Sequence, residues 1–161
     1  MKRLIMSTAI ACLFVTTPAF AASMIESVDV SIDLPAVTNK AAALRYSHIA
    51  DDLKTAIAAL LVDRLAPGGA KITVDISEVE LSNSYTETAG IADTKLVGLV
   101  HVLDDKANVN FDNYTLTVDV NKAKTFLPVT VDMTTLKGSS DEYYRAMIQA
   151  FATTVVGKLK N

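Results

Sequence analysis

Apolar and polar residues alternate strictly from Glu26 onward, and this alternation predicts a half-buried β-strand. The apolar residues would line one side of the strand and the polar residues the other: Val28, Val30, Ile32 and Leu34 against Ser27, Asp29, Ser31 and Asp33. Pro35 has no N–H for a sheet hydrogen bond, so we expect the strand to end there.

A helical period follows this strand. Apolar residues recur every three or four positions: Ala42, Tyr46, Ile49, Leu53, Ile57 and Leu60. The spacing predicts a long amphipathic helix of about seven turns, capped at its start by Thr38 or Asn39. Because Pro67 disfavours helix in the residue before it and the following glycines suit a C-cap, we expect the helix to end at residues 66–69.

The middle of the chain returns to a period of two. Residues 72–81 are apolar at alternate positions, but the alternation shifts by one residue at Ser77-Glu78, which predicts a β-bulge near Ser77. The polar segment 82–94 is expected to be a surface connection. A further strand at 96–103 should end in a turn at 104–106. Residues 109–120 predict one or two more strands, with a second shift of phase at Asp112-Asn113.

The last part of the chain predicts a closing helix. Residues 126–131 are apolar but contain Pro128, so we interpret them as an edge strand or as a segment that covers part of the sheet. Ser139 and Glu142 have the spacing of a capping box. The helix that follows would carry one apolar stripe: Tyr144, Met147, Ile148, Phe151, Val155 and Leu159.

This order of elements predicts the α+β class. A strand, a long helix, three to five strands and a final helix would form a two-layer sandwich. Its sheet would be mainly antiparallel, and the long N-terminal helix and the C-terminal helix would lie on one face. No linker divides residues 22–161, so we expect a single domain.

The first 21 residues are typical of a secretory signal peptide. Lys2 and Arg3 precede an apolar run, Leu4 to Val15, and an Ala-x-Ala cleavage site ends at Ala21. The run is too short to span a bilayer, and we expect no transmembrane segment. The prediction is therefore release into the periplasm or the medium after cleavage following Ala21. Cys12 faintly resembles a lipid-attachment cysteine, but it lies upstream of this site.

Charge and composition narrow the function classes. Removing Lys2 and Arg3 takes the formal net charge from −3 to −5, which disfavours a nucleic-acid partner. Cleavage would also remove the single cysteine, and with it disulfides, thiolate metal sites and cysteine nucleophiles. The chain has 6 glycines and 4 prolines, which excludes collagen-like and low-complexity classes.

No residue pattern points firmly to catalysis, a metal or a cofactor. His48, Asp51 and Asp52 have the spacing of a helical metal site, but they fall off the apolar stripe, so we interpret them as a solvated face. His101 has no triad partner nearby in sequence. The alternating polar residues of 104–112 resemble a calcium loop, yet Lys106 would place a cation among the ligands. We expect no enzyme; the alternative is a small periplasmic enzyme that uses His48 or His101 with acidic residues.

The strand at 96–103 is the informative exception to the polar outer faces of the other strands. One of its faces carries Leu96, Gly98, Val100 and Val102, and the other carries Lys95, Val97, Leu99, His101 and Leu103. We assign the second face outward because it holds the only polar side chains. An apolar patch on a solvated sheet face marks a partner or ligand surface unless the protein covers it. The alternative is internal cover by Phe126, Leu127 and Val129.

The succession of strands around residues 71–81 and 96–120, closed by an amphipathic helix, resembles two families of small domains. They are the periplasmic ABC-transporter auxiliary proteins and the lipopolysaccharide-assembly lipoproteins. The resemblance implies a non-catalytic envelope protein whose partner is another envelope protein, a lipid or an apolar ligand. A structural or self-associating envelope protein, and hence a homo-oligomer, is the other alternative.

Overall fold

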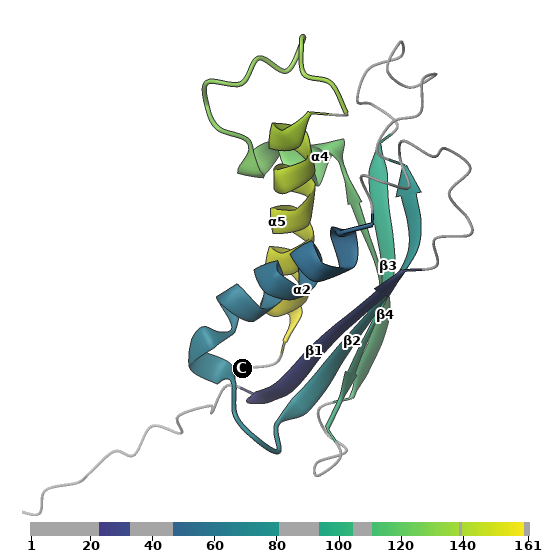
Figure 1. The fold of residues 1–161 in the computed structure, drawn as a ribbon, viewed down its shortest axis with the longest axis vertical. Helices are drawn as coiled ribbons and strands as arrows, with labels where there is room; N and C mark the ends of the chain where they lie inside the picture. The colour runs from purple at the N-terminus through teal and green to yellow at the C-terminus, as the bar shows by residue number, and fades with distance from the viewer. Residues whose placement is uncertain (1–22, 33–46, 81–93, 105–110, 139, 160–161) are drawn as a thin grey trace, which may run out of the picture.

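The computed structural model describes residues 23–32, 47–80, 94–104, 111–138 and 140–159, which form an α+β fold (Figure 1). Four strands make one sheet: β1 (Ile25–Ile32), β2 (Ala70–Glu80), β3 (Lys95–Leu103) and β4 (Asp112–Asp119). Three α-helices accompany them: α2 (Ile49–Leu60), α4 (Val120–Ala123) and α5 (Asp141–Lys158). Two short 3-10 helices, η2 (Val62–Arg64) and η3 (Lys124–Phe126), complete the described elements.

The sheet is mixed, with the strands in sequence order. β1 and β2 are parallel, whereas β2 pairs with β3 and β3 with β4 in antiparallel fashion. Parallel neighbours need a crossover connection, and the one between β1 and β2 contains α2. Two of the three pairings are therefore antiparallel, in agreement with the expectation of a mainly antiparallel sheet.

The predicted bulge in β2 is confirmed. The register of β2 against β3 shifts between Ile76 and Glu78, so that Ser77 is the extra residue. The shift returns Val79 to the core side of the sheet, where it is partly buried against the core. A second irregularity, between Ile25 and Ser27 in β1, is one that the alternation did not reveal.

The core lies between one face of the sheet and the helices α2 and α5, which Figure 1 shows on the same side. From α2 the buried residues are Ile49, Leu53 and Ile57. α5 contributes a broader surface: Tyr143, Ala146, Met147, Ile148, Ala150, Phe151, Ala152 and Val155. Gly98 lets Phe151 approach β3, because a Cβ at Gly98 would lie 3.0 Å from the ring atom Cζ of Phe151.

The long N-terminal helix is not shown. The described helix α2 has 12 residues and begins at Ile49, after a turn at Ser47 and His48. The predicted caps, Thr38 and Asn39, lie outside the described residues. The described helix is about three turns long. Its predicted end at residues 66–69 is wrong, because α2 ends at Leu60 and the 3-10 helix η2 follows.

Three predictions about the second half of the chain are wrong in detail. Val120 begins α4 instead of ending a strand, and Asp119 caps this helix by accepting a hydrogen bond from the backbone N–H of Lys122 at 3.0 Å. Residues 126–131 form no strand: η3 ends at Phe126, and the N–H of Val131 turns back to the carbonyl of Pro128. The N-cap of α5 is Ser140, whose hydroxyl accepts from Tyr143 N–H, whereas Ser139 lies outside the described residues.

Candidate functional site

The candidate site is the outer face of β3, named here the β3 face: Val97, Leu99, His101 and Leu103. The residues between these four are buried beneath the helices. Because successive side chains of a strand point to opposite faces, the four side chains lie on the other side of the sheet. The first three are partly exposed, and Leu103 is 43% exposed. That the β3 face binds a partner stays a prediction.

Polar side chains on the two neighbouring strands frame the β3 face. On β2, the residues opposite Leu103, His101 and Leu99 are Lys71, Thr73 and Asp75. On β4, the residues opposite His101, Leu99 and Val97 are Asn113, Thr115 and Thr117. The apolar residues therefore form a single column with polar columns on both sides.

No described segment covers this column. The helices α2 and α5 pack on the other face of the sheet (Figure 1). The predicted internal cover does not occur either: η3, which holds Phe126, packs on α5 and α4, Leu127 contacts the core on the helix side, and Val129 is fully exposed. Within the described residues, the β3 face thus remains an outer surface.

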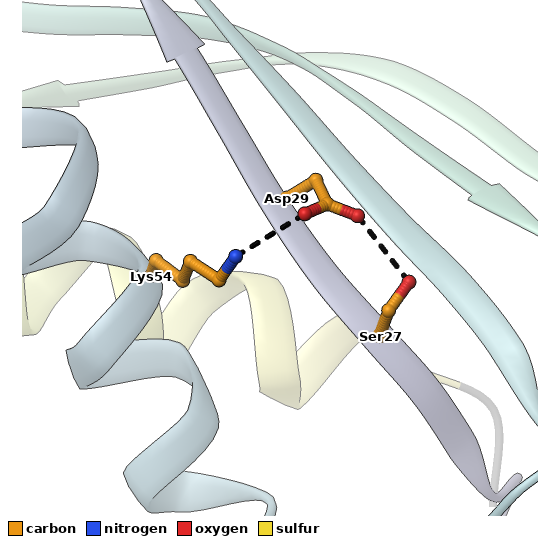
Figure 2. A network of polar contacts seen from close by, with 3 residues as sticks. All are labelled: Ser27, Asp29 and Lys54. Atoms are coloured by element: carbon orange, nitrogen blue, oxygen red, sulfur yellow. Dashed lines mark hydrogen bonds and ion pairs between the residues drawn. The ribbon is translucent and has the colours of Figure 1, made fainter.

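A small polar network lies at the β1 edge of the sheet (Figure 2). Lys54 reaches from α2 to Asp29 on β1, with 3.2 Å between Nζ and Oδ1. Ser27 donates to the other carboxylate oxygen of Asp29 at 3.3 Å. Because both charged side chains are more than half exposed, the pair contributes at most about 1 kcal/mol. The pair lies on β1, an edge strand among the described strands, and charge on an edge strand discourages further strand pairing.

His48, Asp51 and Asp52 do not form a shared site with His101. All three are exposed at the start of α2, on the helix side of the sheet, while His101 lies on the other side. Asp52 accepts a hydrogen bond from the hydroxyl of Tyr144 at 2.6 Å, which links α2 to α5. Among the described residues there is no group of three or more His, Cys, Asp or Glu side chains able to hold a metal ion. Of the calcium-like series at 104–112, residues 105–110 lie outside the described chain.

Two buried tyrosine hydroxyls were not anticipated from the sequence. Tyr143 shares a hydrogen bond with the buried Thr94, and burial raises the pKa of Tyr143 although this bond opposes the rise. The hydroxyl of Tyr114 is buried and has no hydrogen-bond partner among the described residues. Burial, and to a lesser degree the charge of Asp112, raises the pKa of Tyr114 to about 12. The alternation of residues 109–120 carries no signal for the surroundings of the Tyr114 hydroxyl.

An open hollow of about 340 Å³ lies beside the start of α5. Its lining combines Lys137 with two acidic residues, Asp132 and Glu142. The carboxylate of Asp132 already accepts hydrogen bonds from the hydroxyl and the N–H of Thr134, and these bonds lower its pKa. Because the hollow is lined by both positive and negative side chains, and because Asp132 is already hydrogen-bonded to Thr134, its lining does not indicate which class of ligand it would bind.

Comparison with known proteins gave no match, whether to a family model, to a curated protein or to a solved structure. The resemblance of the strand pattern to transporter auxiliary and lipopolysaccharide-assembly domains therefore stays a prediction. In the part of the chain that the structure describes, no helix has the length and apolar character needed to cross a membrane.

Proposed function

We propose that this chain is an exported binding or envelope-assembly module without catalytic activity, and that its partner binds the β3 face. The observation that carries the proposal is the apolar column at the centre of a sheet face that no described segment covers. A contiguous apolar patch on the surface of a soluble protein often marks a partner or ligand site. The amino-terminal signal-like segment supports export, because it has the charged start, apolar run and small-residue end of a secretory signal.

The surroundings of the β3 face favour a protein partner or an apolar ligand. Val97 and Leu99 supply contact area, and the threonine hydroxyls opposite them on β4, Thr115 and Thr117, supply hydrogen-bonding groups at the rim. An apolar centre with a polar rim is the usual anatomy of a protein interface.

Photo-crosslinking tests this proposal. A photoreactive amino acid in place of His101 should give one discrete adduct in an extract of the cell envelope. An excess of the unlabelled wild-type protein should suppress the adduct, and an excess of the Leu99→Ser variant should not. The matched control carries the photoreactive group at Thr153, an exposed position of α5 on the other side of the molecule.

Two outcomes would contradict the proposal. One is an adduct pattern at position 101 that equals the pattern at position 153. The other is equal competition by the wild-type protein and the Leu99→Ser variant. An adduct of twice the mass of the chain would instead identify self-association as the function of the β3 face.

A further inference from the structure

The β3 face lies within a broad sheet surface that another sheet can fit. No described helix lies on it, since α2 and α5 pack on the opposite face of the sheet (Figure 1). Two sheets stack face to face about 10 Å apart, with strand directions within about 30° of each other because both are twisted. Two copies of this chain have sheets of the same twist, so a second copy matches the shape of this surface.

Two opposite charges on β2 lie on either side of one central position. Lys71, Thr73 and Asp75 alternate with buried residues of β2, and all three are exposed. In the ladder they lie opposite Leu103, His101 and Leu99, respectively. Thr73 and His101 therefore form a central row of the surface. The row on one side of it carries a cation and a leucine, and the row on the other side carries a carboxylate and a leucine.

This arrangement is complementary to itself. A twofold axis that runs across the strands through the row of Thr73 and His101 exchanges the two outer rows. Lys71 of one copy then faces Asp75 of the second copy, and the same ion pair forms again in the opposite direction. Leu103 likewise faces Leu99 of the second copy, also twice. Every contact is made in duplicate, as an isologous interface requires.

Asp75 decides where the axis lies. Its carboxylate accepts a hydrogen bond from the hydroxyl of Ser31 at 3.3 Å, and no cation pairs with it in the described part of the chain. An axis through the row of Leu99 would bring the two Asp75 carboxylates together, and like charges across an interface lower affinity. An axis through the row of His101 gives each carboxylate a lysine instead.

We propose that the partner of the β3 face is a second copy of this chain, stacked through Leu99 and Leu103 and oriented by ion pairs between Lys71 and Asp75. The inference rests on the proposed function, because it names the partner that binds there. Lys71 also has an interaction within its own chain. Because an ammonium group has three N–H donors, it can keep this interaction while it binds the second copy.

The size of the surface limits the affinity. Four strands about 4.8 Å apart and three rows of side chains about 6.7 Å apart cover roughly 400 Å² on each copy. A standard stable interface buries about 800 Å² on each partner. We therefore expect a dimer that exchanges readily with the monomer, with a dissociation constant on the order of 100 µM.

Exchanging the two charges tests the proposal. The protein is the chain from Ala22 onward, which contains every residue that the structure describes, and sedimentation equilibrium measures the dissociation constant. Asp75→Lys places two lysines against each other in both contacts and should weaken the dimer about tenfold. Lys71→Asp should do the same with two carboxylates. The double variant restores opposite charges and should recover most of the lost affinity.

A matched control separates this effect from a change of net charge. Asp51→Lys makes the same change of charge at an exposed position of α2, on the helix side of the sheet, and should dimerise as the wild type does. Leu99→Ser keeps the charges but removes the apolar contact, and it should weaken the dimer about tenfold. Circular dichroism checks that each variant is folded.

Three results would overturn the proposal. The first is wild-type protein that stays monomeric well above the expected dissociation constant. The second is a double variant that dimerises no better than the single variants. The third is a loss of affinity for Asp51→Lys that equals the loss for Asp75→Lys.

The photo-crosslinking experiment distinguishes this failure from a failure of the proposed function. A monomeric protein that still gives a discrete adduct with another protein through position 101 keeps the β3 face as a binding site and rules out the second copy as its partner. A monomeric protein whose adducts at position 101 equal those at position 153 contradicts both proposals.

Discussion

Leu99 and Val100 are neighbours on β3 that face opposite sides of the sheet. Replacing each by serine and comparing the losses in stability tests whether the β3 face is exposed or covered. Val100 has no exposed surface and lies between Val74 and Tyr114 in the ladder. Leu99 is partly exposed and lies between Asp75 and Thr115. The two variants receive the same serine at neighbouring positions of the same strand, so they differ mainly in how far the replaced side chain is buried.

The expected free energies of unfolding differ widely. Val100→Ser loses two buried methyl groups, at about 0.8 kcal/mol each, and buries a hydroxyl at a further cost of about 1–3 kcal/mol. The sum is about 3–5 kcal/mol, which lowers the melting temperature of a domain of this size by about 10–15 °C. Leu99→Ser exchanges a partly solvated side chain and should cost about 1 kcal/mol or less.

Thermal unfolding followed by circular dichroism measures both variants, and urea unfolding checks that the transition stays two-state. If Leu99→Ser lowers the melting temperature as much as Val100→Ser does, then another part of the chain covers the β3 face. The binding proposal would lose its main support in that case. A small shift for Leu99→Ser combined with a large one for Val100→Ser is the result that the structure predicts.

Three further predictions concern the cap of α5, the buried hydroxyl of Tyr114 and the close packing at Gly98. Ser140→Ala should lower the free energy of unfolding by about 1 kcal/mol in urea unfolding because α5 loses its N-cap, whereas Ser139→Ala should have a smaller effect. The pKa of Tyr114 is raised to about 12 from an ordinary value of 10.0, so its contribution to stability is complete below pH 10.0 and disappears as the pH rises toward 12. Tyr114→Phe should therefore reduce the loss of stability at alkaline pH, measured by thermal melting. It should not lower stability at neutral pH, because the hydroxyl has no hydrogen-bond partner among the described residues. Gly98→Ala should cost about 1–3 kcal/mol, because the new methyl group meets the ring of Phe151 at 3.0 Å, and an unchanged melting temperature would show that α5 shifts freely away from the sheet.

The sequence by itself determined those features that a local pattern encodes. Alternation identified the strands and the inward side of β3, and the phase shift at Ser77 identified the bulge, because the side-chain period of a strand is two. The helical stripe identified α5, although the serine that caps it was misplaced by one residue. The apolar stripe before Ile49 predicted a longer helix than α2, and because residues 33–46 lie outside the described residues, that part stays a prediction.

Only the tertiary structure decided what depends on distant parts of the chain. The segment from Phe126 to Val129 is as apolar as a strand, but it continues from α4 toward α5 and stays with the helices instead of covering the β3 face. The bridge between Ile25 and Leu65 joins the start of β1 to the segment after α2, and no local window contains both residues. Periodicity indicates the direction in which each side chain leaves its own backbone. Whether that side chain is buried or exposed depends on which other segments lie against it, and those contacts form between elements far apart in sequence when the sheet and helices pack.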